Sequence, residues 1–552
     1  MSKEQELKWY GWGLASKNFD LSRRHNFWPF LREKLQLTSN ETLLPVNLSD
    51  IKLSSSNSTL SAKFEVLLGV NAVRRDDLIR ITHAMGKSYL DLIRIRKGLI
   101  QNPPDFVLYP KTEAQVLEIL QLASDLKIAV IPFGGGTSVV GGVEALKDSG
   151  HIAAISLDLS QLNQVVSIDE ISLLATIEAG MLGPALENAL QARGYTLGHY
   201  PQSFEFSSLG GWIAARSAGQ QSNKYGRVED MVSSLTIANP IEIITTLDAP
   251  ASAAGPSIKQ LLIGSEGLFG VITKAKMRIH KLPTIKNYRG LLFKDFLSGA
   301  QAIRTIIQSG LEPTTIRLSD ELETGAFMKM RPESESMLEN ALSSSVKWYL
   351  KNRGYSESPA LMILGFEAND NSVKKEVKTA LEVCKQFDGM DLGTRVGQHW
   401  YKDRFALPYL RDTLLDHMIM LDTLETATTW SNFSNLYKAV QKALIDSIQS
   451  FGFSPMVFCH ISHSYHDGAS LYFTLMAKQA KDAETEQWQG VKKAASDAIL
   501  ANGGTISHHH GVGRDHAPWA QREHGKLAIA ALNSVKQVFD PQGILNPGKL
   551  IK

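Results

Sequence analysis

The chain has 552 residues, of which 43% are hydrophobic and 21% are charged, so it can bury several sizeable cores. Its 58 basic and 56 acidic residues nearly balance, which gives no support to a nucleic-acid-binding role. It has only two cysteines, which argues against a disulfide framework and favours a reducing compartment. No apolar run approaches the roughly 20 residues that span a bilayer. We therefore expect a cytoplasmic protein, and we leave open a peripheral contact with a membrane.

Changes in pattern along the chain predict four regions. Residues 1–100 contain charged, mostly helical segments that we expect to pack on a larger domain. Residues 101–285 alternate short apolar strands with helices, as in an α/β unit. Residues 286–500 alternate strands and helices again and predict a cap over the first unit. Residues 501–552 hold a histidine-rich stretch and a helix.

The most informative stretch follows a short apolar strand at residues 127–131. Three consecutive glycines at 134–136 are followed by Thr137 and Ser138. Glycine lets the backbone approach a ligand closely, and successive N–H groups form a concave anion site. We interpret this loop as a phosphate cradle; a glycine-rich turn without a ligand is the alternative. Val139 replaces the third glycine of a dinucleotide fingerprint, so we expect a different nucleotide fold.

Three further turns in the α/β unit are rich in glycine or hydroxyl groups. They lie at residues 201–211, 214–219 and 261–273, and in the last of these we expect the glycines to lie between two apolar strands. Four such turns in one domain are far more specific than a single turn. They predict a large ligand with several phosphate and polar groups.

The cap region contains a predicted β-hairpin. Residues 458–465 and 469–475 read as two strands around the Asp467-Gly468 turn. Because side chains alternate along a strand, we expect His463 and Tyr465 to share one face. We expect the cap to contribute contacts to a substrate.

Three consecutive histidines, His508, His509 and His510, lie near the end of the chain. In a strand His508 and His510 would share a face, which leaves two metal ligands as one interpretation. Neither an H-E-x-x-H motif nor a cysteine-rich spacing accompanies them, so we expect no metal site.

Together, these motifs resemble the FAD-binding flavoproteins of the vanillyl-alcohol-oxidase class. The matching stretches are G-G-G-T-S at 134–138, G-S-E-G-x-x-G at 264–270 and N-P-G-K at 546–549. Within that class the chain is most similar to the alkyldihydroxyacetonephosphate (alkylglycerone-phosphate) synthase family, through motifs that run from residues 8–13 to 507–513. The resemblance implies an α+β fold with a two-subdomain FAD-binding domain of the PCMH type at 101–285. It also implies an α/β cap at 286–500, a helical N-terminal extension, and a C-terminal segment at 501–552 that returns to the FAD domain.

The resemblance assigns the contacts with FAD to the four turns. The residues concerned are Pro132, Phe133, Gly134, Gly135, Gly136, Thr137, Ser138, Gln202, Ser203, Phe204, Glu205, Phe206, Ser207, Ser208, Ala215, Arg216, Ser217, Ala218, Gly264, Ser265, Glu266, Gly267, Leu268, Phe269 and Gly270. The glycine loop has no histidine or cysteine that could tether a flavin, so we expect FAD to be bound non-covalently.

The resemblance implies a transferase whose reaction has no net redox change. The family exchanges the acyl chain of acyl-dihydroxyacetone phosphate for a long-chain alcohol, with the flavin as an electrophile. We expect these two lipids as partners, no nucleic acid, and leave a homodimer open. The residues after Gly513 look more like those of general flavin dehydrogenases. A redox enzyme that oxidises a 2-hydroxy acid or glycerol 3-phosphate is therefore the alternative, and the number of glycine turns disfavours a flavin-free protein.

The resemblance also suggests roles for individual residues. Tyr465 matches the family's acid/base tyrosine, with packing under the cap as the alternative. Arg411 matches an arginine that binds the substrate phosphate, as bidentate guanidinium groups do; a salt bridge within its helix is the alternative. Arg317 matches an arginine important for activity, with a structural ion pair as the alternative. The run His508–His510 is expected to position the phosphate and to transfer protons.

Overall fold

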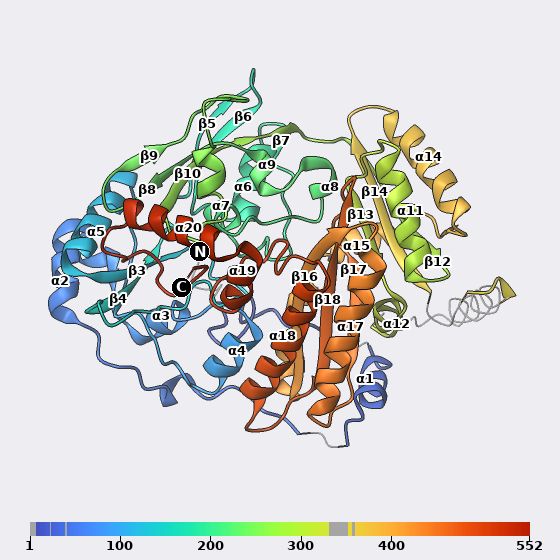
Figure 1. Ribbon diagram of the computed structural model, residues 1–552, viewed down its shortest axis with the longest axis horizontal. Helices are drawn as coiled ribbons and strands as arrows, with labels where there is room; N and C mark the ends of the chain where they lie inside the picture. Colours follow the sequence, from blue (N-terminus) through green and yellow to red (C-terminus); the bar gives the residue numbers. More distant parts are fainter. Residues whose placement is uncertain (1–6, 23, 39–40, 331–351, 356–358, 552) are drawn as a thin grey trace.

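The computed structural model describes residues 7–22, 24–38, 41–330, 352–355 and 359–551. In Figure 1 most of the blue-to-green part of the chain forms one half of the molecule, and the yellow-to-orange part forms the other, with the blue helix α1 (Phe27–Leu35) beside it. The red C-terminal helix α20 (Lys526–Phe539) lies back over the blue-to-green half. Within the described ranges, no helix is long and apolar enough to cross a membrane.

A small four-stranded sheet carries the glycine loop. Its order is β1-β2-β4-β3, and β2 and β3 both run parallel to β4. Helix α5 (Glu113–Leu126) connects β2 to β3; Thr112 caps it by accepting a backbone N–H, and Val116 and Ile119 are buried at helical spacing. The strands are β1 (Val73–Arg74), β2 (Phe106–Leu108), β3 (Ile128–Phe133) and β4 (Ala153–Asp158).

The C-terminal segment joins the same sheet. Leu545 forms a parallel bridge with Val130 of β3, and the Val130 N–H donates to the carbonyl of Ile544 at 2.8 Å. Residues that are more than 400 positions apart in the chain therefore meet beside the glycine loop.

A five-stranded antiparallel sheet of order β5-β6-β10-β8-β9 completes this half, together with the pair β7 and β11. The strands are β5 (Val165–Asp169), β6 (Leu174–Glu178), β7 (Tyr195–Thr196), β8 (Val232–Ala238), β9 (Ile243–Thr245), β10 (Val271–Arg278) and β11 (His280–Lys281). The helices between them are α6 (Gly183–Gln191), α7 (Leu209–Ala214), α8 (Ser222–Tyr225), α9 (Val228–Met231) and α10 (Ile258–Leu262).

The second half is built on a seven-stranded antiparallel sheet of order β15-β12-β14-β13-β17-β18-β16. Its strands are β12 (Ile285–Phe293), β13 (Thr315–Ser319), β14 (Ala360–Ala368), β15 (Met390–Asp391), β16 (Ile419–Thr429), β17 (Met456–Ile461) and β18 (Gly468–Lys478). One apolar core is shared with this sheet by α11 (Phe296–Gln308), α14 (Ser372–Gln386), α17 (Phe433–Ser450) and α18 (Glu484–Ala501) (Figure 1), and α4 (Tyr89–Arg96) also contributes to it.

The opposite face of this sheet carries a separate apolar cluster. Leu421, Phe458 and Met476 alternate with residues that face the larger core, and they pack against α1, α12 and α16. These helices and the remaining elements are α1 (Phe27–Leu35), η1 (Leu48–Asp50), α2 (Ser58–Leu68), η2 (Val70–Ala72), α3 (Asp77–Thr82), α4 (Tyr89–Arg96), α12 (Glu321–Lys329), α15 (Thr394–Asp403), α16 (Leu407–Asp416) and α19 (Ala517–His524).

Two expected strands differ from the structure. The stretch before Gly264 is helix α10, not a strand, because the Ser257 side chain caps it and its apolar run is too short to separate the two forms by pattern. Strand β17 ends at Ile461, before Tyr465, because the hairpin connection already begins at residue 462. The strand alternation that was expected to place Tyr465 therefore does not reach it.

Candidate active site

The glycine loop packs closely against the turn at 203–208. A Cβ added to Gly135 would lie 1.6 Å from the carbonyl oxygen of Phe206, so only glycine allows the two segments to approach this closely. The Ser138 hydroxyl accepts the N–H of Gly142 at 3.0 Å and closes the loop on itself. The concave backbone that was expected from sequence is thus fixed by packing.

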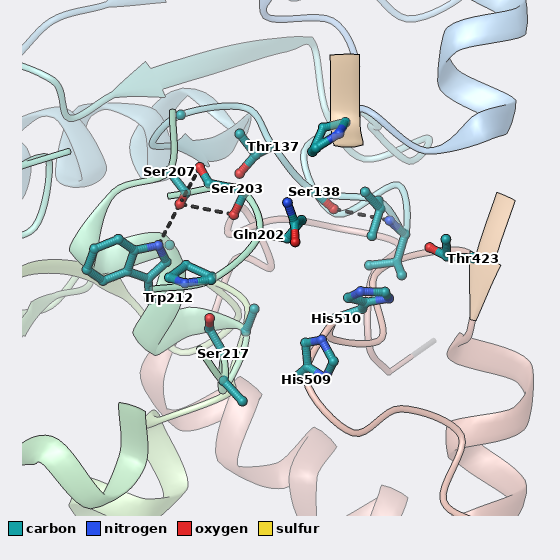
Figure 2. A pocket seen from close by; sticks show the side chains of 18 of the residues that line it. Thr137, Ser138, Gln202, Ser203, Ser207, Trp212, Ser217, Thr423, His509 and His510 are labelled. Carbon is teal, nitrogen blue, oxygen red and sulfur yellow. Dashed lines mark hydrogen bonds between the residues drawn. The ribbon is translucent and has the colours of Figure 1, made fainter. Parts of the chain in front are cut away.

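The 203–208 turn holds its hydroxyl groups in a hydrogen-bonded chain. Trp212 Nε1 donates to Ser207 Oγ at 2.6 Å, and Ser203 Oγ donates to Ser207 Oγ at 3.0 Å (Figure 2). The Ser208 side chain caps α7 by accepting a backbone N–H. Polar groups are therefore presented to the cavity in defined positions.

The turn at 264–270 connects the glycine loop to the histidine loop. The half-buried Glu266 side chain accepts the N–H groups of Val512 at 2.5 Å and Gly513 at 2.7 Å. Asn546 Nδ2 donates to the carbonyl of Glu266 at 2.7 Å. Burial raises the pKa of Glu266 to about 7, against the opposite effect of the two N–H donors.

Most of the predicted cofactor residues line the cavity that these turns enclose. They are Pro132, Phe133, Gly134, Gly135, Gly136, Thr137, Ser138, Gln202, Ser203, Ser207, Ser208, Ala215, Ser217, Ala218, Glu266, Gly267 and Gly270. Among residues outside the predicted set, Gln220 and Asn546 also line it.

The other predicted cofactor residues support the wall and do not line the cavity. Phe269 is buried in the core of the five-stranded sheet, as are Phe204 and Leu268. Glu205 pairs with Lys17 at 3.0 Å, and the Arg216 side chain donates to carbonyls before the 264–270 turn. For the residues outside the lining, contact with FAD stays a prediction; they are Phe204, Glu205, Phe206, Arg216, Gly264, Ser265, Leu268 and Phe269.

The three histidines lie on a loop that is held by one carboxylate. Glu425 of β16 accepts the backbone N–H groups of His508 at 2.5 Å, His509 at 3.0 Å and His510 at 2.8 Å, and the Ser507 hydroxyl at 2.9 Å. Burial alone would raise the pKa of Glu425, but the histidines and these donors hold it well below its usual value. The sequence shows Glu425 as an acidic residue within an apolar strand, and the sequence analysis assigned it no role.

Tyr465 lies next to this loop but does not line the cavity. Its hydroxyl is 2.5 Å from His508 Nε2, and His508 Nδ1 is 2.9 Å from His509 Nδ1. His509 and His510 do line the cavity, as Figure 2 shows, whereas His508 lies behind them. Tyr465 and the three histidines therefore lie together, but only His509 and His510 line the cavity.

Tyr472 is the tyrosine that lines the cavity, and the sequence analysis did not identify it. Its ring stacks on His460 at 4.7 Å between centroids and lies 5.9 Å from His509 and 5.4 Å from His510. Burial raises the pKa of Tyr472 to about 12, so its hydroxyl stays protonated near neutral pH. It belongs to the second strand of the hairpin, seven residues beyond the tyrosine chosen from the motif.

Arg317 lines the cavity and also forms the ion pair that was its alternative interpretation. Its guanidinium donates to Glu323 at 3.1 Å, and His460 Nδ1 lies 3.0 Å from the same oxygen. The Phe327 ring lies 5.9 Å from the guanidinium. Burial would raise the pKa of Glu323, but His460 and Arg317 lower it to about 2, so it is a carboxylate.

Arg411 of α16 lines the cavity without the salt bridge that was considered for it. Asp412 instead binds Lys8 Nζ at 3.0 Å, and Asp416 pairs with Arg96. Arg411 Nε has no hydrogen-bond partner among the described residues. Burial lowers the pKa of Arg411, because the nearby carboxylates offset the loss of hydration of the cation only in part. The site therefore has a buried donor available for an anion.

Beyond Arg317 the cavity wall becomes apolar. Residues from α1, α12, α16 and the sheet face opposite the large core line this apolar arm: Phe27, Leu31, Ala326, Phe327, Met330, Leu407, Leu410, Leu421, Phe458 and Met476. One continuous cavity thus combines glycine turns, histidines, two arginines and an apolar arm.

Comparisons with known proteins identify the family. Residues 104–247 match the family described as FAD binding domain, and residues 282–550 match the C-terminal domain of FAD linked oxidases. An alkyldihydroxyacetonephosphate synthase from Dictyostelium discoideum is 37% identical over 87% of this chain and 78% of its own length. Its counterpart from Trypanosoma brucei brucei is 32% identical over 99% and 92%. The chain belongs to the alkyldihydroxyacetonephosphate synthase family.

Solved structures agree with this assignment. An alkyldihydroxyacetonephosphate synthase superposes with a TM-score of 0.85 at 30% identity, over 99% of this chain and 98% of that one. A p-cresol methylhydroxylase, at 14% identity and a TM-score of 0.65 over 92% of this chain and 99% of that one, shares the fold. The α+β fold of the PCMH type expected from the sequence is therefore confirmed.

FAD is the cofactor of this synthase-family chain, and the described residues fit it. The cavity has a backbone cradle at Gly135 that a Cβ would fill, fixed hydroxyls at Ser203 and Ser207, and neutral backbone donors around residues 134–138. These segments would hold the phosphate and polar groups of FAD. The mode of attachment is untested, so non-covalent binding stays a prediction from the lack of cysteine and histidine in the glycine loop.

One cluster of histidines has spacing compatible with a metal ion. In the part of the chain that the structure describes, ring nitrogens of His463, His508 and His509 lie within 4.8 Å of one another. This is a different set from the pair His508 and His510 suggested by strand alternation. His463 Nε2 is 2.9 Å from the carbonyl of Gly219, and His508 is engaged by Tyr465 and His509, so their nitrogens already have partners.

Proposed function

We propose that the protein is an FAD-dependent synthase that exchanges the acyl chain of acyl-dihydroxyacetone phosphate for a long-chain alcohol. The observation that carries this proposal is the continuity of one cavity from the FAD turns, past Arg411, into an apolar arm; the buried Nε of Arg411 has no hydrogen-bond partner among the described residues. A substrate with a phosphorylated head and a long alkyl chain carries an anionic group followed by an apolar one, in the same order as the arginine and the apolar arm.

Arg411 is the group we assign to the substrate phosphate. Within the part of the chain that the structure describes, its buried Nε has no acceptor, and hydrogen bonds from a charged donor to phosphate are stronger than those between neutral groups. A bound phosphate would also compensate a buried positive charge, which is costly when unpaired. Arg317 is a weaker candidate because Glu323 already neutralises it.

We assign the apolar arm as the binding site for the alkyl chain of the substrate. Each methylene buried there contributes about 0.8 kcal/mol, so a long chain gains much of its binding free energy in the arm. An enzyme for a small hydroxy acid has no need of such an arm. This observation separates the synthase from the redox alternative.

His509, His510 and Tyr472 are placed for proton transfer in the cavity. Bound FAD supplies an electrophilic centre for the exchange. Burial lowers the pKa of His509 to about 3 and that of His510 below its usual value, so both imidazoles are neutral and can accept a proton. The Tyr472 hydroxyl remains protonated and can donate one. A role for Tyr465 in direct contact with substrate stays a prediction from the motif.

The decisive assay incubates the purified holoenzyme with palmitoyl-dihydroxyacetone phosphate and hexadecanol. We expect one ether product and one released fatty acid per turnover, with no reduced acceptor. Reduction of an artificial acceptor with D-lactate or glycerol 3-phosphate, without ether formation, would reject the synthase in favour of a dehydrogenase.

We also propose that the protein works at a lipid surface, because long-chain alcohols partition into membranes. Sedimentation with phosphatidylcholine vesicles that contain hexadecanol tests this. Recovery of the protein only in the supernatant, with ether synthesis intact, would show that it takes its substrate from solution.

A further inference from the structure

We propose that the N-terminal segment at residues 7–14 is part of the active site and that the indole N–H of Trp12 binds the phosphate of the substrate. This segment contains the motif W-Y-G-W-G at residues 9–13, to which the FAD turns, the histidine loop and the two arginines do not belong. The inference rests on the proposed synthase function for the identity of the substrate, and on the contacts of the segment for the identity of the donor.

The N-terminal segment is a small hairpin that is held by Asp412 of α16. Its two ends form an antiparallel bridge. The Asp412 carboxylate accepts the backbone N–H of Trp12 at 3.0 Å and also pairs with Lys8 Nζ at 3.0 Å. Lys8 and Asp412 are both buried. The segment is therefore fixed to the helix that carries Arg411, at the residue that follows Arg411 in the chain.

The glycines on either side of Trp12 allow this close packing. A Cβ added to Gly11 would lie 2.5 Å from Asp412 Oδ2, and one added to Gly13 would lie 2.6 Å from the Tyr409 ring. Gly13 also has a φ of +73°, in the left-handed region that favours glycine. Contact with α16 therefore requires the G-W-G pattern, and the tryptophan between the two glycines takes a fixed position.

Trp12 lines the active-site cavity, and its indole N–H has no acceptor there. The residue is only 5% exposed, and its ring packs edge-to-face on Phe206 at 5.7 Å between centroids. Its Nε1 is buried without a hydrogen-bond partner among the described residues. An unpaired buried donor is costly, and the N–H of a buried tryptophan usually has a partner. This donor therefore indicates an acceptor on a bound ligand.

The chemistry of the neighbouring groups points to an anionic acceptor. Among the described residues that line the cavity, the buried side-chain nitrogens without a partner are Trp12 Nε1 and Arg411 Nε. Both are N–H donors, and Asp412 connects the segments that carry them. Phosphate oxygens can accept from both, and hydrogen bonds to an ionised acceptor are stronger than those between neutral groups. Trp12 thus supplies a neutral donor beside the charged one.

Trp12→Phe tests this assignment, because it removes the N–H and keeps an aromatic ring. In the holoenzyme we expect the Kd for dihydroxyacetone phosphate, measured by calorimetric titration, to rise about 10-fold through loss of a hydrogen bond to a charged acceptor. The KM for palmitoyl-dihydroxyacetone phosphate should rise by the same factor, while kcat changes little. The flavin content and the Kd for hexadecanol, which has no phosphate, should stay at the wild-type values.

Trp9→Phe is the matched control. Trp9 belongs to the same segment, its ring lies edge-to-face on Tyr10 at 5.3 Å, and it does not line the cavity. This variant should keep the wild-type affinity for dihydroxyacetone phosphate. An equal loss in both variants, or an equal loss of hexadecanol affinity in Trp12→Phe, would mean that the tryptophans only stabilise the segment and would overturn the inference. Unchanged phosphate affinity in Trp12→Phe would overturn it as well, and a reduced flavin content alongside would assign the N–H to FAD.

Failure of the proposed function gives a different result. The wild-type enzyme would then form no ether, but its affinity for dihydroxyacetone phosphate would still exceed that of Trp12→Phe about 10-fold. A wild-type holoenzyme that binds neither dihydroxyacetone phosphate nor inorganic phosphate would overturn the anion site itself, whatever the ether assay shows.

Discussion

The carboxylate of Glu425 accepts the backbone N–H of His508 at 2.5 Å, and it bonds the next two histidines in the same way. A single buried side chain in β16 thereby shapes a loop that lies more than 80 residues away in sequence. Burial raises the pKa of this carboxyl group, but the three histidines and the backbone N–H donors lower it well below its usual value, so Glu425 is a carboxylate.

Replacing Glu425 with Gln should disorder the histidine loop. The amide presents N–H groups to N–H donors, and hydrogen bonds to charged groups contribute about 1.5–3 kcal/mol. We expect unfolding to become easier by about 2–3 kcal/mol, with a large loss of ether formation. Glu523→Gln is the control, since exposed Glu523 binds Thr505 and Ile506 at the start of the same loop. Equal effects in both variants would contradict a special role for Glu425.

Glu425 also predicts how stability depends on pH. Its pKa is depressed in the folded protein, so its contribution is complete above the unfolded value of about 4.3 and is lost as the pH falls through the folded value. The free energies of unfolding of wild type and Glu425→Gln should therefore converge below pH 4.3. Denaturant titrations across that range measure this. A difference that stays constant on acidification would contradict the assigned ionisation.

Tyr472→Phe should abolish turnover while FAD remains bound. Tyr472 lines the cavity with its ring near those of His509 and His510, and general acid–base groups contribute about 10²- to 10⁴-fold. The expected measurement is ether formation at saturating substrate, together with the flavin spectrum. Tyr437→Phe, in α17 and outside the cavity lining, is the control. Retained activity in Tyr472→Phe would remove this tyrosine from the chemistry.

Gly135→Ala should prevent FAD binding without unfolding the protein. The added Cβ would lie 1.6 Å from the Phe206 carbonyl oxygen, so the glycine loop and the 203–208 turn would have to separate. The ratio of flavin to protein absorbance after purification measures the result. Gly150→Ala is a suitable control, because its Cβ would meet only the Asp148 side chain at 3.3 Å. Full flavin content in Gly135→Ala would show that the two turns can move apart.

Arg411→Met should affect binding and stability in opposite directions. Removal of a buried cation with a free donor leaves thermal stability unchanged or higher. Loss of a charge-assisted hydrogen bond of about 1.5–3 kcal/mol should raise KM for the phosphorylated substrate about 10- to 100-fold. Arg317→Met is the comparison, because it leaves Glu323 without its guanidinium partner and should destabilise the protein. An unchanged KM in Arg411→Met would place the phosphate elsewhere.

The sequence by itself determined the cofactor site and the family. Gly135 and its neighbouring glycines indicate that another group approaches the backbone closely, because only glycine tolerates such an approach. This requirement is local, so it can be recognised from the sequence alone. The same motifs could not separate residues that face FAD from residues that face the core. Gly267 lines the cavity and Phe269 does not, because side-chain direction depends on how the turn packs.

Only the tertiary structure showed which residues come together around the candidate active site. Glu425, Tyr472 and His508 lie on separate segments whose contacts depend on sheet pairing and on the return of the C-terminal segment to β3. Neighbours in space carry no local signature when they are far apart in sequence, so a motif led to Tyr465 while the cavity contains Tyr472. Likewise, the sequence could not show that Arg411 lacks a salt bridge with Asp412 or Asp416. The structure shows it, because these two carboxylates bind Lys8 and Arg96 instead.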